Sequence, residues 1–451
     1  MTNANSRAAV SPARALAADV LVRVWEEDAF AAAALNAELE RRPQLDPRDV
    51  GLATELTYGV LRAEAYLDEK MAALASRKIY APEPRVRAHL LMGAYALLFL
   101  DRVPAFAAVS EAVEGVREAT DDRVAGFANA VLRKVGAEVE AKGRPALADA
   151  VAASAPGWLR GALRRTLGRA GATAYLAAGP VPPPIGLALA KGEDREAWLE
   201  QLRAAAPNAS FEAGTVSPRA IVVRGAGDVR RLPGAGTAWI VQEEGAQTVA
   251  LCAGARPGDR VLDACAGRGN KSWLLAAEVG NDGAVDAADL HPAKLEKLRE
   301  GPVGALVRET YPVDWSLGPG DVPEGYDVVI VDAPCSGTGT LRRRPEIGRK
   351  REEGDLARLA ELQTMIARRA ATRVKTGGHL VFAVCSVLKE EGEEVVQKLV
   401  SLGGDDGVKL APAPFEDELG KALSKGTHMA RVLPHEHGTD GYFFARLAVT
   451  R

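Results

Sequence analysis

The sequence predicts a multidomain protein with an all-α N-terminal domain, a small α+β module and a C-terminal α/β domain of the Rossmann-like type. The chain has 451 residues, and a domain usually holds about 100 to 200. Apolar residues recur three and four apart from Ser11 to about Val135, as in packed helices. From about Trp239 apolar strands alternate with helices, which is typical of a parallel sheet covered on both faces.

The first region, residues 8–138, is predicted to be helical throughout. Ser11-Pro12 and Asp46-Pro47 are helix starts in which a capping side chain precedes proline at the first helical position. The segment His89 to Pro104 is apolar on most sides. We therefore expect it to form a central helix that its neighbours bury.

The second region, residues 152–235, is predicted to be a small α+β module of the ferredoxin-like kind. Within it lies the proline-rich run Gly179 to Pro184, which cannot continue a helix. The predicted elements are a strand over Ile185 to Ala190, a helix over Asp194 to Ala206 and a strand over Ala220 to Gly225.

The third region, residues 236–451, is predicted to be a doubly wound α/β domain. We expect strands at Arg260 to Cys265, Ala284 to Leu290, Tyr326 to Pro334 and Gly378 to Ser386, with a weak strand near Val303 to Val307. Helices are expected from Lys271, from Pro292 and from Asp355 to about Val374.

Composition narrows the class of protein. Hydrophobic residues make up 47% and charged residues 26% of the chain, and the net charge is −3, so polyanion binding would need local basic patches. The four cysteines, at 252, 265, 335 and 385, fit neither a disulfide scaffold nor a zinc site. We expect a soluble, cytoplasmic monomer without membrane segment or metal.

Ligands of such sheets bind beyond the carboxyl ends of the strands. The first strand leads into a loop of small residues, 263–271, that opens onto a helix, and Asp289 follows the second strand twenty residues after Gly269. An acid at that separation can accept hydrogen bonds from ribose hydroxyls. A tight turn followed by a solvated acid is an equally good interpretation of these features alone.

The loop matches neither phosphate-binding glycine motif, which favours a nucleoside without phosphates, such as S-adenosylmethionine. Asp314 is a candidate partner for the adenine amino group, although Glu309 lies close by and an exposed loop acid is the common case. The predicted cofactor residues are Cys265, Ala266, Gly267, Arg268, Gly269, Asn270, Lys271, Asp289, Asp314 and Asp332.

Two cysteines follow strands at the same sheet edge, Cys335 within Asp332-Ala-Pro-Cys and Cys385 after the strand that ends at Val384. Free cysteines are mostly small buried hydrophobes, but those belong in strand middles. Thiolate addition to carbon 6 of cytosine activates carbon 5 for methylation. Asp332 is placed to hydrogen-bond or protonate ring nitrogen 3, and a second thiolate could remove the carbon 5 proton.

Longer motifs resemble a known family. Asp332 to Gly339 with Leu341 to Ile347, Gly377 to Val387 with the acids 390, 391 and 393, and Pro434 to Phe443 resemble the RNA 5-methylcytosine methyltransferases of the NOL/NOP/Sun type. Ser11 to Ala15 and Phe127 to Arg133 resemble the NusB-type domain of its bacterial RsmB/Sun (Fmu) branch. The resemblance implies methylation of one cytosine of small-subunit (16S) ribosomal RNA, with Cys385 as nucleophile and Cys335 assisting product release.

The cofactor loop departs from the family pattern. The family usually has Cys-Ala-Ala-Pro-Gly-Gly-Lys, whereas this chain has Arg268 in place of the proline and Asn270 in place of a glycine. Asn tolerates positive φ better than most residues, so we expect the turn to survive.

The run Leu341 to Arg351 carries six basic residues and one acid and is predicted to contact RNA phosphates, although charge runs are usually solvated. Its predicted RNA-binding residues are Arg342, Arg343, Arg344, Arg349, Lys350 and Arg351. A second basic cluster, at 160, 164, 165 and 169, is nearly as well explained as a solvated face. The target base must be unstacked to react.

Three other functions compete with this hypothesis. A methyltransferase could act on another RNA, such as tRNA. A non-catalytic, antitermination-like RNA-binding protein would fit the N-terminal region but leaves the two strand-end cysteines unexplained. A methyltransferase acting on an exocyclic amine needs no cysteine, and Asp-Ala-Pro-Cys disfavours it.

Overall fold

The computed structural model describes residues 10–75 and 82–451, and the chain divides into two compact units. Unit 1 comprises residues up to 160 together with 169–182 and 341–350. Unit 2 comprises 161–168, 183–340 and 351–451. The three-part division expected from sequence stays a prediction, and residues 8 and 9 and 76–81 of its first part lie outside the described residues.

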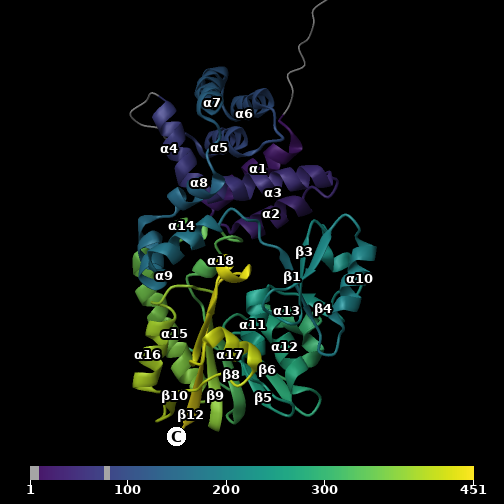
Figure 1. Cartoon of the computed structure of the whole chain (residues 1–451), viewed down its shortest axis with the longest axis vertical. Helices are drawn as coiled ribbons and strands as arrows, with labels where there is room; N and C mark the ends of the chain where they lie inside the picture. Colours follow the sequence, from purple (N-terminus) through teal and green to yellow (C-terminus); the bar gives the residue numbers. More distant parts are fainter. Residues whose placement is uncertain (1–9, 76–81) are drawn as a thin grey trace, which may run out of the picture. The chain divides into compact units, whose positions relative to one another are not determined.

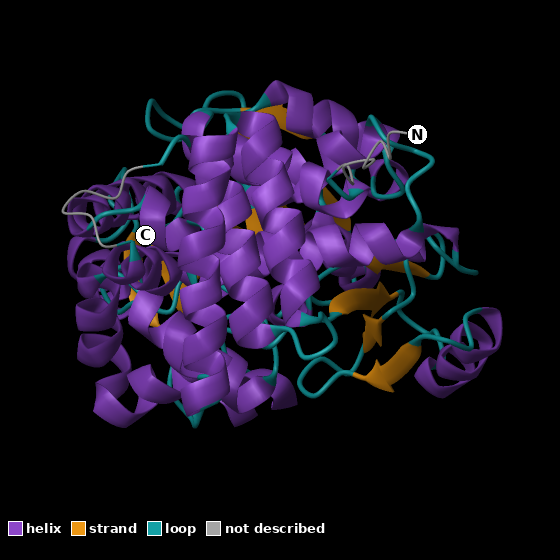
Figure 2. Ribbon diagram, turned by 90° about the horizontal axis from the view of Figure 1, so that it is seen from above, coloured by secondary structure: helices purple, strands orange, loops and turns teal. Residues whose placement is uncertain are grey.

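Unit 1 is built of helices, which Figures 1 and 2 show as coiled ribbons. Its long helix α5 (Pro84–Phe99) is buried on nearly every side, as its sequence predicts. Other helices in the described part of unit 1 are α1 (Pro12–Glu26), α2 (Ala31–Glu40), α3 (Pro47–Arg62), α4 (Glu64–Leu74), α6 (Ala105–Ala119), α7 (Asp122–Lys142), α8 (Leu147–Ser154) and the short α14 (Ile347–Lys350).

The predicted helix starts are present in unit 1. Helix α1 begins at Pro12 directly after Ser11, but the expected cap is absent, because the Ser11 side chain forms no capping hydrogen bond with this helix. Helix α3 begins at Pro47, and the Asp46 carboxylate accepts a hydrogen bond of 2.8 Å from the Arg48 amide. This bond satisfies one of the amides that a helix leaves free at its first turn.

Helix α9 (Gly157–Ala177) is kinked at Gly168, whose φ of +71° is outside the helical region. Residues 161–168 of this helix belong to unit 2, whereas 157–160 and 169–177 belong to unit 1. Glycine is suited to this position because positive φ carries no Cβ penalty.

Unit 2 contains a small antiparallel sheet in the order β2-β3-β1-β4. Its strands are β1 (Ile185–Leu189), β2 (Ser210–Ala213), β3 (Ala220–Arg224) and β4 (Trp239–Val241), with helix α10 (Arg195–Ala205) between β1 and β2. The expected α+β module is therefore present. Trp239, near the predicted start of the third region, pairs with Leu189 in this sheet.

The second sheet of unit 2 has the order β10-β12-β9-β8-β5-β6-β7. Its parallel strands are β5 (Arg260–Asp263), β6 (Ala284–Asp289), β7 (Thr310–Pro312), β8 (Tyr326–Asp332) and β9 (Val374–Val384). Its antiparallel strands are β10 (Lys409–Pro412), β11 (Met429–Val432) and β12 (Tyr442–Thr450). The sheet is thus mixed rather than purely parallel (Figure 1).

The weak strand expected near Val303 to Val307 is displaced. Residues Gly304–Leu306 form a 3₁₀ turn, and the strand is β7 at Thr310–Pro312. Asp314 nevertheless follows this strand, as expected.

Helices cover both faces of the mixed sheet, and two apolar clusters fill the space between. One cluster includes side chains of α11 (Glu244–Leu251), α12 (Asn270–Val279) and α13 (Pro292–Glu300). The other includes side chains of α15 (Glu353–Ala371) and α16 (Glu393–Leu402). Short helices α17 (Glu418–Ser424) and α18 (Pro434–His437) precede the last strands. Because β5, β6, β7, β8 and β9 run parallel, their carboxyl ends lie along one edge of the sheet.

No helix within residues 10–75 and 82–451 is long and apolar enough to cross a bilayer. Across the same residues no three His, Cys, Asp or Glu side chains are grouped so as to hold a metal ion.

Candidate active site

Two thiols meet at the carboxyl edge of the mixed sheet. Cys335 lies in the loop after β8 and Cys385 is the first residue after β9, and their sulfur atoms are 3.3 Å apart. Both side chains are half-buried and neither forms a disulfide. Strands β8 and β9 are parallel neighbours with Asp332 opposite Ala383, so the topology itself brings these two strand ends together.

The two thiols form a coupled pair. The hydrogen bond to Cys385 raises the pKa of Cys335 well above its usual value, and burial and the nearby Glu391 and Asp332 carboxylates act in the same direction. Either sulfur can be the donor of this hydrogen bond. The pair can therefore hold one proton between the two sulfur atoms, so that one acts as a thiol and the other as a nucleophile.

Lys271 and Asp332 form an ion pair beside the thiols. The lysine side chain is 9% exposed and the aspartate side chain 26%. Burial opposes the charge on Lys271, but the Asp332 carboxylate outweighs it and the pKa of Lys271 is raised. The ammonium also lies 5.5 Å from the centre of the Tyr442 ring. Asp332 is consequently held as the acceptor partner of a buried cation.

Lys271 was assigned from sequence to the cofactor loop, together with residues 265–270. The structure places its ammonium on Asp332, whereas the rest of the loop lies between β5 and α12. Ala266 donates its amide to the Ala288 carbonyl at 2.8 Å, and Cys265 and Ala266 are half-buried. Arg268 is exposed. The cofactor role of these residues stays a prediction.

Positive φ in this loop falls on Gly267 (+58°) and Gly269 (+83°). Asn270 is instead the first residue of α12, with its side-chain amide 3.3 Å from the Val241 carbonyl. The expectation that Asn270 would need tolerance of positive φ was therefore wrong. The turn survives because glycine occupies both strained positions.

Asp289, the last residue of β6, is hydrogen-bonded to the cofactor loop. Its carboxylate accepts hydrogen bonds from the amides of Gly267 and His291, each at 2.9 Å, and Lys294 lies 3.4 Å away. Only 6% of Asp289 is exposed. The strand ends thus fix this carboxylate against the loop.

The loop and Asp289 together fit an adenosyl group. A Cβ added to Gly267 would meet nothing within 4 Å, so the backbone there has open space into which a ligand can approach. A carboxylate fixed beside such a loop can accept hydrogen bonds from ribose hydroxyls. These features match S-adenosylmethionine, the cofactor expected from sequence.

Asp314 lies in the loop after β7 and is half-buried. Its carboxylate accepts a hydrogen bond of 2.8 Å from the Ser316 amide. Hydrogen bonds from the side chain and backbone of Ser316 lower the pKa of Asp314. Asp314 is thus held as an anion at the sheet edge, and its contact with adenine stays a prediction.

Asp263, at the end of β5, belongs to the same edge but was noted from sequence only as the start of the loop. It is buried, and its carboxyl group accepts a hydrogen bond of 2.8 Å from Ser272. Burial raises the pKa of Asp263 to about 6.

The sequence analysis also missed a buried polar network behind the thiols. Glu391 is fully buried and accepts hydrogen bonds from the Ser336 amide at 2.7 Å and from the Gln363 side chain at 2.9 Å. It also accepts a hydrogen bond from the Ser336 hydroxyl. In the sequence Glu391 is one acid of the acidic run 390–393, and the signal that could single it out is that this run follows a cysteine-bearing strand end.

The basic run 341–351 has a different environment. Residues 341–350 belong to unit 1, where Arg349 pairs with Glu64 at 2.8 Å and Lys350 pairs with Asp28. Arg342 is buried, and Arg62 donates to its carbonyl at 2.8 Å.

Glu346 is the one acid of the run. It is also buried and accepts a hydrogen bond of 3.0 Å from the Ala31 amide, at the first position of α2. Arg344 is exposed, Arg343 and Arg351 are half-buried, and RNA contact by the run stays a prediction.

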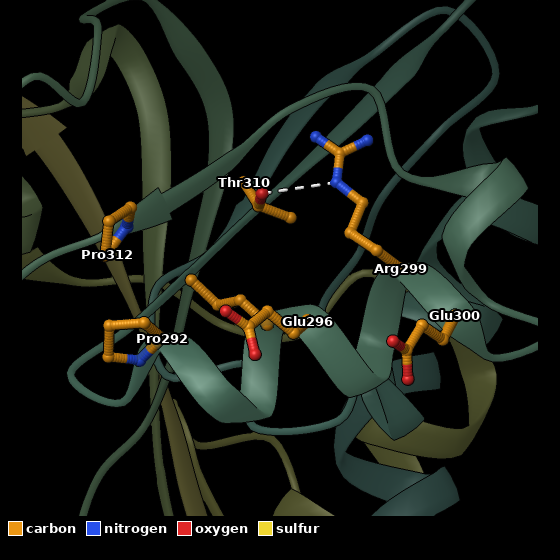
Figure 3. Close-up of a pocket in the computed structure, with 7 residues that line it drawn as sticks. Pro292, Glu296, Arg299, Glu300, Thr310 and Pro312 are labelled. Atoms are coloured by element: carbon orange, nitrogen blue, oxygen red, sulfur yellow. Dashed lines mark hydrogen bonds between the residues drawn. The ribbon is translucent and has the colours of Figure 1, made fainter.

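A surface pocket of about 350 Å³ lies beside the outer strand β7 (Figure 3). Pro292, Glu296 and Arg299 of α13 line it opposite Thr310 and Pro312, and Arg299 donates to the Thr310 hydroxyl at 3.2 Å. The predicted catalytic and cofactor residues are not among its lining residues.

Comparison with known proteins bears on both units. The family model described as 16S rRNA methyltransferase RsmB/F matches residues 250–448, and the NusB family model matches residues 11–137. A relative from Pseudomonas putida, named ribosomal RNA small subunit methyltransferase B, is 33% identical over 96% of this chain and 98% of its own length.

Solved structures share the fold. The crystal structure of PH0851 superposes with a TM-score of 0.76 at 21% identity and covers 97% of this chain and 99% of its own. The structure of NSun6 from Pyrococcus horikoshii with SFG superposes with a TM-score of 0.54 at 17% identity and covers 65% of this chain and 98% of its own.

Proposed function

Because this chain belongs to the RsmB/F family of 16S rRNA methyltransferases, we propose that it methylates carbon 5 of a cytosine in small-subunit ribosomal RNA through a covalent bond from Cys385. It is an S-adenosylmethionine-dependent RNA methyltransferase. The single observation that carries the finer proposal is the 3.3 Å separation of the Cys335 and Cys385 sulfur atoms at the strand ends beside the cofactor loop.

The reaction begins at Cys385. Its thiolate adds to carbon 6 of the cytosine, which raises the electron density at carbon 5. S-adenosylmethionine, when bound, supplies an electrophilic methyl group. Asp332, paired with Lys271, is suited to accept a hydrogen bond from the amino group of the base.

Cys335 then completes the reaction. Once the Cys385 sulfur is bonded to carbon, it no longer accepts a hydrogen bond as a thiolate, and the interaction that most raises the pKa of Cys335 is lost. Cys335 can then release its own proton to solvent and, as a thiolate, take the carbon 5 proton. The electrons of that carbon–hydrogen bond form the 5,6 double bond, and the Cys385 thiolate leaves.

The competing functions are less well supported. A non-catalytic RNA-binding protein does not need two thiols in contact beside a cofactor loop. Methylation of an exocyclic amine needs neither thiol. Methylation of tRNA uses the same chemistry and is separated only by the choice of RNA, for which the family match favours 16S rRNA.

The test uses the full chain, labelled S-adenosylmethionine and either small-subunit RNA or tRNA. We expect Cys385→Ala to reduce methyl transfer to background while the melting temperature stays within a few degrees. Cys335→Ala should retain the first methyl transfer and accumulate protein bonded to methylated RNA on denaturing gels. Retained turnover by Cys385→Ala, or absence of the adduct with Cys335→Ala, would contradict the mechanism, and preferential labelling of tRNA would contradict the substrate.

A further inference from the structure

We propose that Glu391 is a positioning residue that fixes the Cys335 loop against Cys385 and so sets the rate of product release. This inference rests on the proposed function, because it assigns Glu391 a part in the step that Cys335 performs. None of the hydrogen bonds among the described residues joins Glu391 to either sulfur atom.

The first step of the argument is how Glu391 and Gln363 hold both neighbours of Cys335. The Glu391 carboxylate accepts from the Ser336 amide at 2.7 Å and from the Ser336 hydroxyl. Gln363 donates to the Pro334 carbonyl at 3.0 Å and to Glu391 at 2.9 Å. The backbone on each side of Cys335 is therefore held by one connected pair of side chains, Glu391 from the turn before α16 and Gln363 from the middle of α15.

The second step is that the same network reaches the residue after Cys385. The Ser386 hydroxyl lies 2.9 Å from the Thr338 hydroxyl and 3.4 Å from the Ser336 hydroxyl. The Gly339 amide also donates to the Cys385 carbonyl at 3.0 Å. Both cysteine-bearing segments are thus tied to a common set of hydrogen bonds that includes Glu391.

The third step is burial. Glu391, Gln363 and Ser386 are fully buried, and Ser336 is 2% exposed. Burying a carboxylate costs free energy unless its hydrogen bonds compensate for the lost hydration. The network is also rigid, since each acceptor is held by groups on elements of the sheet and its covering helices.

The consequence concerns release rather than methyl transfer. Cys385 directly follows β9, whose pairing with β8 and β12 does not involve Glu391, so we expect it to stay in place without Glu391. The Cys335 loop follows β8 with no regular element until the short 3₁₀ turn at Thr338–Thr340, and it depends on Glu391 and Gln363 for its position. Removing Glu391 should therefore displace Cys335 and leave Cys385 in position.

The experiment compares Glu391→Ala, Glu391→Gln and the matched control Glu390→Gln in the full chain with small-subunit RNA and labelled S-adenosylmethionine. Glu390 is the neighbouring acid, whose carboxylate pairs with Arg165 at 2.9 Å. Two rates are measured, formation of methylated RNA in a single turnover and release of RNA from protein on denaturing gels.

We expect Glu391→Ala to slow release at least tenfold relative to methyl transfer, and so to accumulate the methylated adduct. Glu391→Gln should restore most of the release rate, because its amide can keep the bonds to the Ser336 amide and to Gln363. Glu390→Gln should leave both rates unchanged. Addition of Glu391→Ala to Cys335→Ala should not slow release further, since both changes act on the same step.

Three results would overturn the inference. One is a Glu391→Ala protein in which transfer and release fall by the same factor. Another is a Glu391→Gln protein as slow in release as Glu391→Ala, which would assign the effect to charge and not to position. If Glu391→Ala does not fold, Gln363→Leu removes the donor to Pro334 and should slow release in the same selective way; an unchanged ratio of the two rates would then reject the inference.

The outcome for Glu391 can be separated from that of the proposed function. If Cys335→Ala forms the adduct and Glu391→Ala does not, the positioning role fails and the cysteine mechanism stands. If Cys335→Ala itself gives no adduct, the cysteine mechanism fails.

Discussion

The carboxyl edge of the mixed sheet and the basic run 341–351 are close in sequence but differ in what their charged side chains do. At the sheet edge, Lys271 and Asp332 come from elements 61 positions apart and pair beside two thiols. In the basic run, Arg349 and Lys350 pair with acids of the helical unit. Charge at the sheet edge therefore surrounds a reactive site, whereas much of the charge in the run holds a segment of chain within unit 1.

The difference shows which kind of sequence signal carries function. Strand ends of a parallel sheet meet by topology, so reactive residues placed there necessarily become neighbours. A run of basic residues has no such constraint. Its partners come from acids elsewhere in the chain, here Glu64 and Asp28, and only a fold reveals them.

The largest effect should follow from breaking the ion pair at the sheet edge. Lys271→Met removes the cation and leaves the Asp332 carboxylate without its partner at a site that is 26% exposed. We expect single-turnover methyl transfer to fall about 10²- to 10³-fold, the usual effect of removing one preorganised electrostatic group. The measurement is the rate of methyl transfer together with calorimetric binding of S-adenosylmethionine.

The control for this change is Lys375→Met, which removes a half-exposed lysine paired with Asp327 near the opposite ends of β8 and β9. It should alter the rate only slightly. Weaker cofactor binding by Lys271→Met, with an unchanged rate once the protein is saturated, would return Lys271 to the cofactor role expected from sequence.

An intermediate effect should appear in the pH dependence of the free energy of unfolding, and it should arise from Asp263. Its pKa is about 6 in the folded protein and about 3.9 in an unfolded chain. Between these values the folded state holds the proton more tightly, so stability falls as pH rises from about 4 to about 6. The difference of about two pKa units corresponds to about 3 kcal/mol.

Asp263→Asn keeps an oxygen for the Ser272 hydroxyl but cannot ionise. The free energy of urea unfolding of the variant, relative to the parent, should therefore rise between pH 4 and pH 6 and level off above that range. Asp282→Asn, at an exposed position, is the control and should show no such trend. A constant difference between parent and Asp263→Asn across this range would show that Asp263 ionises normally in the folded protein.

Much of the fold could be predicted because it depends on local pattern. The buried helix α5 is apolar on most sides, and strands β5, β6, β8 and β9 are apolar runs that precede small or acidic residues. Strand β12 was not predicted. It is the last strand in sequence, but it pairs antiparallel with β9 in the middle of the sheet order, and such long-range pairing leaves no periodic signal.

The candidate site was predicted in part for the same reason. Cys335 and Cys385 could be placed together because each follows a strand. Glu391 could not be distinguished from Glu390 and Glu393, since burial on one side of a turn depends on how Gln363 of α15 packs against it. The positions of positive φ at Gly267 and Gly269 likewise depend on where α12 begins.

The smallest effects should separate members of the basic run. Arg344 is exposed, whereas the Lys350 side chain is 10% exposed and paired with Asp28. If the run contacts phosphates, Arg344→Ala should weaken binding of small-subunit RNA about fivefold near physiological salt and lower the slope of log K against log salt by about 1. Lys350→Ala should instead reduce stability by about 0.2 to 1 kcal/mol, the usual value of a partly exposed pair.

These two variants, measured by RNA titration at several salt concentrations and by thermal melting, decide how far the basic run differs from the sheet edge. Equal losses of RNA affinity would mean that the ion pair with Asp28 opens when RNA binds. An unchanged salt slope for Arg344→Ala would remove this residue from the RNA contact and leave the run with its packing role in unit 1. In the sequence Arg344 and Lys350 lie on either side of Glu346, whose side chain is buried. The two results therefore also show whether both basic side chains contact RNA or only one of them.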